Sequence, residues 1–413
     1  MFPRFSPVKR STRIHDLHTT DTVFFDDNLL QEKRNIVFYQ PRKLVFGAGC
    51  STRFVDDFAW EGIGNLFVLT IPPLLKQVEK LVDELAKKGI SGQICCDISA
   101  EPSFADVEKI RMQAHAFGAR AIAGIGGGSV LDTAKILAAM LNSDMQIREV
   151  VGINQLINRS IYLACLPTTS GTGSEVSPNA IFLDEKDGGK KAIISPYLVP
   201  DASYIDPELT LGLPPGVTAS TAIDAFTHCL EAYINNFAHP ITDRYALEGM
   251  RLIYHNLPRA LREPGNTEAR TALALGSLYG GMCLGPVNTG AIHALSYPLG
   301  SRFKIPHGVS NALLLPYVAE FNRPYAVDRF AQVGETLGLA GTDHAEDKAK
   351  KAVSLMRNMV ADAGLPMKLS DLGISADALP AMAEEALTVQ RLLKNNVRNV
   401  RYPDAVALYN KAF

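Results

Sequence analysis

The chain has 413 residues, of which 47% are hydrophobic and 20% are charged, and its formal net charge is -2 at pH 7. Such a protein has no basic field for a phosphate backbone, so nucleic acid is excluded as a partner. No run approaches the roughly 20 apolar residues that cross a bilayer, and no membrane association is expected. The length exceeds what a single core organises comfortably, and it predicts two domains.

The six cysteines show no CxxC pair and lie mostly in apolar runs. This pattern is typical of reduced thiols in the core of a cytoplasmic protein. Residues 1–34 are predicted to form an N-terminal arm. The basic, acid-free beginning of this arm is also a feature of transit peptides, but its prolines interrupt any amphipathic helix.

Strand-like and helix-like segments alternate between residues 35 and 206. The apolar run 65–70 predicts a buried strand, and a helix follows it, with Pro72 and Pro73 at its start and Gly89 at its end. Next come a strand at 91–98, a helix at 104–117, a strand at 121–126, a helix at 129–141 and a strand at 161–167. The alternation predicts an α/β domain whose parallel sheet is covered on both faces.

Long helical patterns replace the alternation after residue 206, and strand-like runs are nearly absent there. The expected helices span 218–234, 241–254, 267–284 and 289–299, with several more toward the C-terminus. Residues 207–413 are therefore predicted to form an all-α domain. The cleft between the two halves is the natural place for a ligand.

A glycine-rich loop ends the strand predicted at 121–126. Gly126, Gly127 and Gly128 precede Ser129, which opens a helix, and Asp132 follows one turn later. Free backbone N–H groups and the helix dipole favour a phosphate there, and Ser129 is placed to cap the helix or to donate to a phosphate oxygen. The alternative is a tight turn that needs glycine for its dihedral angles alone.

A second polar loop follows the strand predicted at 161–167. It carries several hydroxyl groups between glycines, including Thr168, Thr169 and Thr172. Loops after parallel strands lie at the carboxyl edge of the sheet, where α/β folds bind ligands. The alternative interpretation is a solvated serine- and threonine-rich turn.

Four side chains in the second half form a candidate metal site. Asp224 and His228 are four residues apart on a predicted helix, so they share one face. His293 and His307 lie further along the chain among apolar neighbours. A single histidine on an apolar face is usually a core residue, but three with an aspartate indicate a ligand set. Such a set suits Fe(II), Zn(II) or Mn(II), and the residues do not choose among them.

Four motifs together resemble the iron-containing (group III) alcohol dehydrogenases: GGGSVLDTAK, PTTSGTGSEVSPNAIF, AIDAFTHCLEAY and HALSYPLGSRFKIPHGVSNA. The resemblance runs from about residue 35 to the C-terminus. It implies a Rossmann-like dinucleotide-binding domain over 35–206 and a metal-binding helical domain over 207–413, in a dehydroquinate synthase-like architecture. It also implies a homodimer or larger homo-oligomer, NAD or NADP as cofactor, and one divalent ion, with Fe(II) ahead of Zn(II) and Mn(II).

The resemblance assigns roles residue by residue. Asp224, His228, His293 and His307 match the metal ligands and are thereby part of the catalytic site. The cofactor-binding positions match Gly126, Gly127, Gly128, Ser129, Asp132, Thr168, Thr169, Thr172 and Lys190, the last on the ribose side.

The sequence departs from the family pattern at two places. Many members that prefer NAD carry an aspartate just after the first nucleotide-binding strand, whereas this chain has Ile71, which leaves NADP open. Many also carry a histidine four residues after the third ligand, and Tyr297 stands there as a candidate replacement proton donor. Arg302 and Lys304 either favour a carboxylate-bearing substrate or are solvated loop charges.

The expected function is metal-dependent, NAD(P)-linked hydride transfer between a nicotinamide and a small alcohol, aldehyde or hydroxy acid. The first alternative is a metal-free keto acid reductase resembling the maleylacetate reductases. The others are a lyase resembling 3-dehydroquinate synthase and a non-catalytic protein that keeps the fold for assembly.

Overall fold

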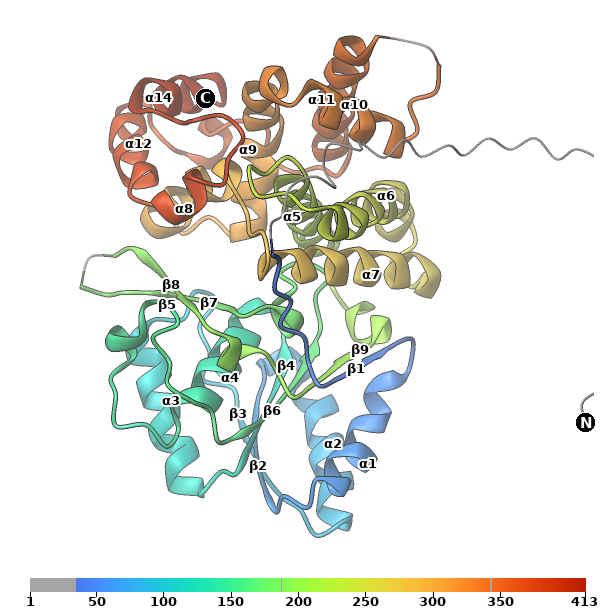
Figure 1. Cartoon of the computed structure of the whole chain (residues 1–413). Helices are drawn as coiled ribbons and strands as arrows, with labels where there is room; N and C mark the ends of the chain where they lie inside the picture. Colours follow the sequence, from blue (N-terminus) through green and yellow to red (C-terminus); the bar gives the residue numbers. More distant parts are fainter. Residues whose placement is uncertain (1–34, 187, 342–343) are drawn as a thin grey trace, which may run out of the picture. The chain divides into compact units, whose positions relative to one another are not determined.

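A six-stranded parallel sheet forms the first half of the computed structural model, which describes residues 35–186, 188–341 and 344–413 (Figure 1). The arm predicted at residues 1–34 lies outside the described residues. The sheet consists of β1 (Lys43–Phe46), β2 (Asn65–Leu69), β3 (Ser91–Cys95), β4 (Ala121–Gly126), β6 (Tyr162–Pro167) and β9 (Ala202–Ile205). All neighbours in the order β1-β9-β6-β4-β2-β3 are parallel, which confirms the predicted sheet.

Helices cover both faces of this sheet. They are α1 (Arg53–Trp60), α2 (Leu75–Lys87), α3 (Phe104–Phe117) and α4 (Gly128–Met140). Alternate residues of a strand point to opposite faces, so Leu66 and Val68 of β2 pack into a core with α1 and α2. Phe67 and Leu69 pack into a separate core with α3 and α4. The six cysteines are free thiols, and all but Cys96 are buried.

The side of the sheet to which the chain adds its next strand changes at β2. It leaves β2 through α2 to reach β3 on one side, then returns through α3 to β4 on the other side. Right-handed crossovers therefore place α2 and α3 on opposite faces, and the loops after β2 and β4 diverge at the carboxyl edge. Such a switch point is where open α/β sheets bind ligands, and the glycine-rich loop begins there.

A second, small sheet was not predicted. It has the order β5-β8-β7, formed by β5 (Gly152–Ile153), β7 (Asn179–Leu183) and β8 (Lys190–Ile194), with β7 and β8 antiparallel. Its strands are two or five residues long, so their alternation of polar and apolar residues gave little signal. The sheet matters for the site because it carries Lys190.

Helices make up the second half of the chain in Figure 1. They are α5 (Pro215–Tyr233), α6 (Pro240–Arg262), α7 (Thr267–Leu284), α8 (Ala291–Phe303), α9 (His307–Asn322), α10 (Val327–Thr336), α11 (Ala345–Asp362), α12 (Leu379–Leu387), α13 (Gln390–Leu393) and α14 (Tyr402–Lys411). The described residues after β9 form no strand, as predicted. Residues Ile36–Phe413 group into one compact unit, and the division into two domains after residue 206 stays a prediction. None of the helices in the described ranges has the length and apolar character that a membrane span requires.

The helix predicted at 241–254 is longer than expected, because α6 continues through Pro258 to Arg262. Proline inside a helix removes one backbone hydrogen bond and costs about 3 kcal/mol. Leu257 and Ala260 are both buried in the core of the helical half. Their packing offsets the cost, and tertiary contacts therefore decide where this helix ends.

Candidate functional site

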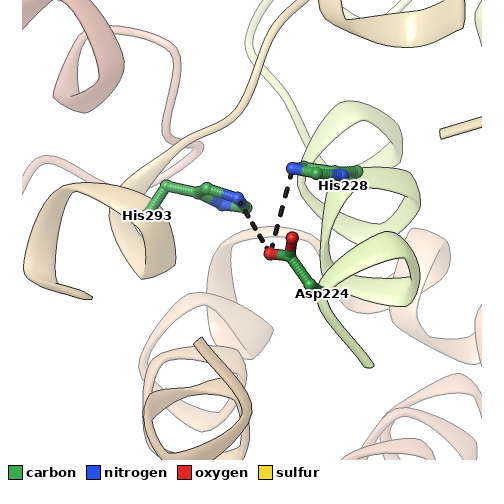
Figure 2. A group of neighbouring side chains, drawn as sticks. All are labelled: Asp224, His228 and His293. Atoms are coloured by element: carbon green, nitrogen blue, oxygen red, sulfur yellow. Dashed lines mark ion pairs between the residues drawn. The ribbon is translucent and has the colours of Figure 1, made fainter. Parts of the chain in front are cut away.

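Four side chains predicted to bind a metal converge between α5, α8 and α9. Asp224 and His228 lie one turn apart on α5, and His293 lies in the first turn of α8. Figure 2 shows the His228 and His293 rings directed at the Asp224 carboxylate, and their Nε2 atoms lie 3.9 and 3.5 Å from its Oδ1. His307 opens α9, and its Nε2 lies 3.8 Å from the same oxygen.

The spacing of these donor atoms fits a single ion. Ligands about 2.1 Å from a tetrahedral metal are roughly 3.4 Å from one another. The separations of 3.5 to 3.9 Å to Asp224 Oδ1 are close to that value. The donor atoms of Asp224, His228 and His293 all lie within 4.8 Å of one another, and the three residues are buried. One carboxylate with imidazoles suits a divalent transition metal.

The protonation of three of the four candidate ligands, Asp224, His228 and His307, also suits a cation, whereas an ion would have to displace a proton from His293. Burial lowers the pKa of His228 to about 4 and the pKa of His307 to about 3, so both imidazoles are neutral at pH 7. Burial raises the pKa of Asp224, but the nearby histidines outweigh it and hold that pKa well below its usual range. Metal ligands must be deprotonated, and these three groups meet the requirement.

Asn311 lies beside three of the four candidate ligands and was not predicted. Its amide Nδ2 donates to Asp224 Oδ1 at 2.6 Å and lies 3.1 Å from His293 Nε2 and 3.2 Å from His307 Nε2. Atoms of Asp224, His293 and His307 thus all lie within hydrogen-bond distance of the Asn311 amide. Its position four residues after His307 on one helix was the available signal.

Glu231 lies behind His293, one of the four candidate metal ligands Asp224, His228, His293 and His307, which together are called the metal cluster, and it was not predicted. Its Oε2 lies 2.6 Å from His293 Nδ1, and its Oε1 accepts a hydrogen bond from the backbone N–H of Ile292. Burial lowers the pKa of His293, but Asp224 and Glu231 outweigh it and raise that pKa to about 9. A carboxylate on the far nitrogen orients a metal-binding imidazole and fixes its tautomer. Glu231 follows Asp224 by about two turns of α5, so helical spacing was its signal.

A cavity of about 160 Å³ opens beside the metal cluster, between the sheet and the helices. Besides the four predicted ligands, its lining includes Glu101, Gly128, Ser129, Asp132, Thr172, Lys190, Asn288, Thr289, Tyr297 and Arg391. The Tyr297 ring centroid lies 6.3 Å from that of His307, and its hydroxyl accepts a hydrogen bond from Arg391 Nη2 at 2.6 Å. Tyr297 therefore faces the same space as the metal ligands.

A larger cleft of about 1060 Å³ runs along the switch point of the sheet. Ile71 lines it after β2, Gly127 after β4, and Thr168 and Thr169 after β6. The cleft and the smaller cavity share Ala100, Gly128 and Ser129 in their linings, so the two spaces adjoin at the glycine-rich loop. A ligand held in the cleft can thus reach the metal cluster.

The glycines of the loop are required by close packing rather than by unusual dihedral angles. None of the three has a positive φ. A Cβ on Gly128 would lie 2.6 Å from Thr172 Cγ2, and one on Gly127 would lie 3.3 Å from Thr169 Cγ2. The dihedral alternative is therefore wrong, since the threonine-rich loop packs onto the glycine-rich loop.

Three predicted cofactor residues make contacts, or lie in places, that the sequence did not indicate. Gly126 lines neither the cavity nor the cleft. Ser129 does not cap α4, because its hydroxyl donates to the backbone oxygen of Ala100 and the N-cap is Gly127. Asp132 lines the cavity, but its carboxylate also accepts from the backbone N–H of Ile181 at 2.9 Å. That bond ties α4 to β7.

Lys190 lies in the metal-side cavity and is absent from the lining of the larger cleft. Its Nζ pairs with Glu101 at 2.8 Å. Arg302 and Lys304, by contrast, line neither space, and Arg302 pairs with Glu385 at 2.6 Å on the exposed side of α8. These two cations are exposed charges at the C-terminal end of α8, which favours the second interpretation except that Arg302 belongs to the helix and not to a loop.

Comparison with known proteins agrees with this architecture. A family profile described as iron-containing alcohol dehydrogenase matches residues 41–207, and one described as the Fe-containing alcohol dehydrogenase family, C-terminal, matches residues 218–413. The sulfoacetaldehyde reductase of Bilophila wadsworthia is 35% identical over 91% of this chain and 99% of its own.

Two solved structures are similar throughout. A 1,3-propanediol oxidoreductase has a TM-score of 0.89 at 31% identity and covers 92% of this chain and 100% of its own. A sulfoacetaldehyde reductase from Bifidobacterium kashiwanohense, in complex with NAD⁺, has a TM-score of 0.83 at 25% identity over 92% of this chain and 99% of its own. The chain therefore belongs to the iron-containing alcohol dehydrogenase family and is an oxidoreductase that acts on CH–OH groups.

Proposed function

We propose that this protein is a metal-dependent, nicotinamide-linked reductase of short aldehydes that also oxidises the corresponding alcohols. The observation that carries the proposal is the four-donor cluster of Asp224, His228, His293 and His307, three of them buried, which lines the cavity next to the larger cleft. The similarity to sulfoacetaldehyde reductase and 1,3-propanediol oxidoreductase supports a short carbonyl substrate.

The residues divide the work by position. When bound, the divalent ion supplies Lewis acidity at the substrate oxygen and the nicotinamide supplies or takes the hydride. The four ligands hold the ion, while Gly127, Gly128 and the threonine-rich loop hold the cofactor in the adjoining cleft. The predicted role of Lys190 on the ribose side stays part of this proposal.

The choice of nicotinamide depends on the loop after β2. Ile71, Pro73 and Gln77 line the cleft there, and the lining contributed by this segment carries no carboxylate that would repel a 2′-phosphate. We therefore propose that NADP(H) is accepted besides NAD(H), the cofactor in the Bifidobacterium structure. Kinetics with NADH and NADPH at matched concentrations measure the ratio.

Metal analysis with activity assays tests the proposed function. We expect about one iron, zinc or manganese per chain in purified protein. Reduction of a panel of short aldehydes should be lost on chelation and restored by added metal. Metal-free protein that still oxidises a nicotinamide with keto acids would instead support the maleylacetate reductase-like alternative.

Tyr297 is proposed to supply a proton to the substrate oxygen during reduction. Its hydroxyl lies in the metal-side cavity and accepts from Arg391, which leaves its own hydrogen free to donate. Tyr297→Phe should lower kcat by about tenfold, since water can replace the donor in part. Single-turnover kinetics measure the chemical step, and an unchanged rate would exclude this role.

The quaternary structure and the location of the protein are further parts of the proposal. We expect a homodimer or larger homo-oligomer, as the resemblance to the family implies. We also expect the protein to lie in the cytoplasm, because its cysteines are free thiols. Light scattering of the full chain measures the assembly, and a monomer at assay concentration would contradict it.

A further inference from the structure

Two cations flank Tyr297 in the cavity beside the metal cluster. Lys190 Nζ lies 5.9 Å from the centroid of the Tyr297 ring, and the guanidinium carbon of Arg391 lies 5.8 Å from it. Both residues line the cavity. They come from distant parts of the chain, Lys190 from β8 and Arg391 from α13. Two cationic side chains therefore lie near the Tyr297 ring.

The two cations differ in how they are neutralised. Lys190 is paired with the Glu101 carboxylate at 2.8 Å, so its charge is largely cancelled. For Arg391, no carboxylate of the described residues lies within the 4.0 Å of an ion pair, and the half-buried guanidinium makes one hydrogen bond, to the Tyr297 hydroxyl. A guanidinium has five N–H donors, so Arg391 retains donors and charge for a bound anion.

The metal cluster and Arg391 line the same small cavity, which suits a short substrate that contacts both. The Tyr297 ring lies near both groups, since its centroid is 6.3 Å from that of the His307 ring and 5.8 Å from the guanidinium carbon of Arg391. The cavity is small, at about 160 Å³, against about 1060 Å³ for the adjoining cleft. It therefore admits a molecule of a few non-hydrogen atoms with a carbonyl at one end and an anionic group at the other.

We propose that Arg391 determines substrate specificity by binding the carboxylate or sulfonate of a short anionic aldehyde while the carbonyl lies at the metal cluster. This inference rests on the proposed function, because it names the substrate class of the same site. Arginine binds planar and tetrahedral oxyanions through paired N–H donors, and such charge-assisted bonds are strong where water is partly excluded.

Paired aldehydes of equal shape test the proposal. Sulfoacetaldehyde is compared with 3,3-dimethylbutanal, and 4-oxobutanoate with 4-methylpentanal, so each pair differs mainly in charge. The full-length metal-loaded protein should have the higher kcat/KM for the charged member, and the two pairs show which oxyanion is preferred. Arg391→Gln should lower kcat/KM for the charged aldehydes by about 10- to 100-fold, chiefly through KM, and change the neutral ones little.

Three further variants separate specificity from structure. Arg302→Gln is the matched control, since it removes an exposed cation that lines neither space, and it should leave the preference unchanged. Arg391→Lys keeps the charge and should restore part of the preference. Tyr297→Phe removes the hydroxyl that Arg391 contacts but should keep the preference for charged aldehydes.

A binding measurement without turnover completes the test. Saturation-transfer NMR should detect ethanesulfonate on the wild-type protein and not on Arg391→Gln. Equal kcat/KM values within both pairs, or an equal fall for charged and neutral aldehydes in Arg391→Gln, would overturn the inference and leave the proposed function intact. If no aldehyde is reduced with either nicotinamide, the proposed function fails, and Arg391-dependent binding of ethanesulfonate decides whether the anion site itself stands.

Discussion

Asp224→Ala should abolish metal binding and lower aldehyde reduction by at least about 1,000-fold. Asp224 Oδ1 lies between 3.5 and 3.9 Å from the Nε2 atoms of His228, His293 and His307, so it is the donor that the other three share. Its loss removes the only negative charge among the proposed ligands. A bound metal contributes several kcal/mol to stabilising the developing charge on the substrate, and each 1.36 kcal/mol is a tenfold change in rate.

Metal content of the Asp224→Ala protein is measured by elemental analysis, and the rate by NADH and NADPH oxidation. Nicotinamide binding, measured by protein fluorescence, should persist because Asp224 does not line the larger cleft. Asp243→Asn is the matched control. Asp243 is another buried carboxylate of the helical half, and its Oδ2 lies 3.1 Å from Arg329 Nη1. It does not belong to the metal cluster, so the Asp243→Asn protein should keep the metal. Full activity in Asp224→Ala would refute the metal-dependent mechanism.

Glu231→Gln should weaken metal binding by about 10- to 100-fold, although Glu231 is not itself a proposed ligand. Its carboxylate contacts His293 Nδ1 through one oxygen and the backbone N–H of Ile292 through the other. Glutamine has the same shape but only one acceptor oxygen, so its amide must present a donor to one of these two partners. The imidazole loses both a charge that raises its basicity and a fixed orientation.

Competition with a chelator of known affinity measures the metal affinity of the Glu231→Gln protein. At saturating metal, activity should recover most of its wild-type value, which separates this supporting role from that of a ligand. Glu248→Gln is the control, because Glu248 is exposed on α6 and pairs with Arg251. An unchanged metal affinity, or a loss that no metal concentration restores, would contradict the proposed support of His293.

The residues near each metal ligand were predictable to different degrees. Asp224 and His228 were assigned as neighbours because helical spacing places residues four apart on one face, and α5 confirms the helix. Glu231 and Asn311 follow the same spacing rule but were missed, since a glutamate or asparagine on a helix has many more common explanations than metal binding. Only the contacts with His293 distinguish them from ordinary polar residues.

The sequence by itself determined the order of the elements, the parallel sheet followed by helices, and the two loops at the carboxyl edge. These features depend on local periodicity, on glycine and proline, and on motifs a few residues long. The tertiary structure decided which charges face the substrate. Arg302 and Lys304 were the cations nearest to His307 in the chain, yet they lie outside the cavity.

Arg391 contacts the site from 94 residues beyond Tyr297, and Glu231 reaches His293 across 62 residues. No local pattern encodes such pairs, because they form only when α5, α8 and α13 pack together. Local physical chemistry therefore specified the helices and strands of this protein, whereas the packing of distant segments determined the support of its metal cluster and the charge of its cavity.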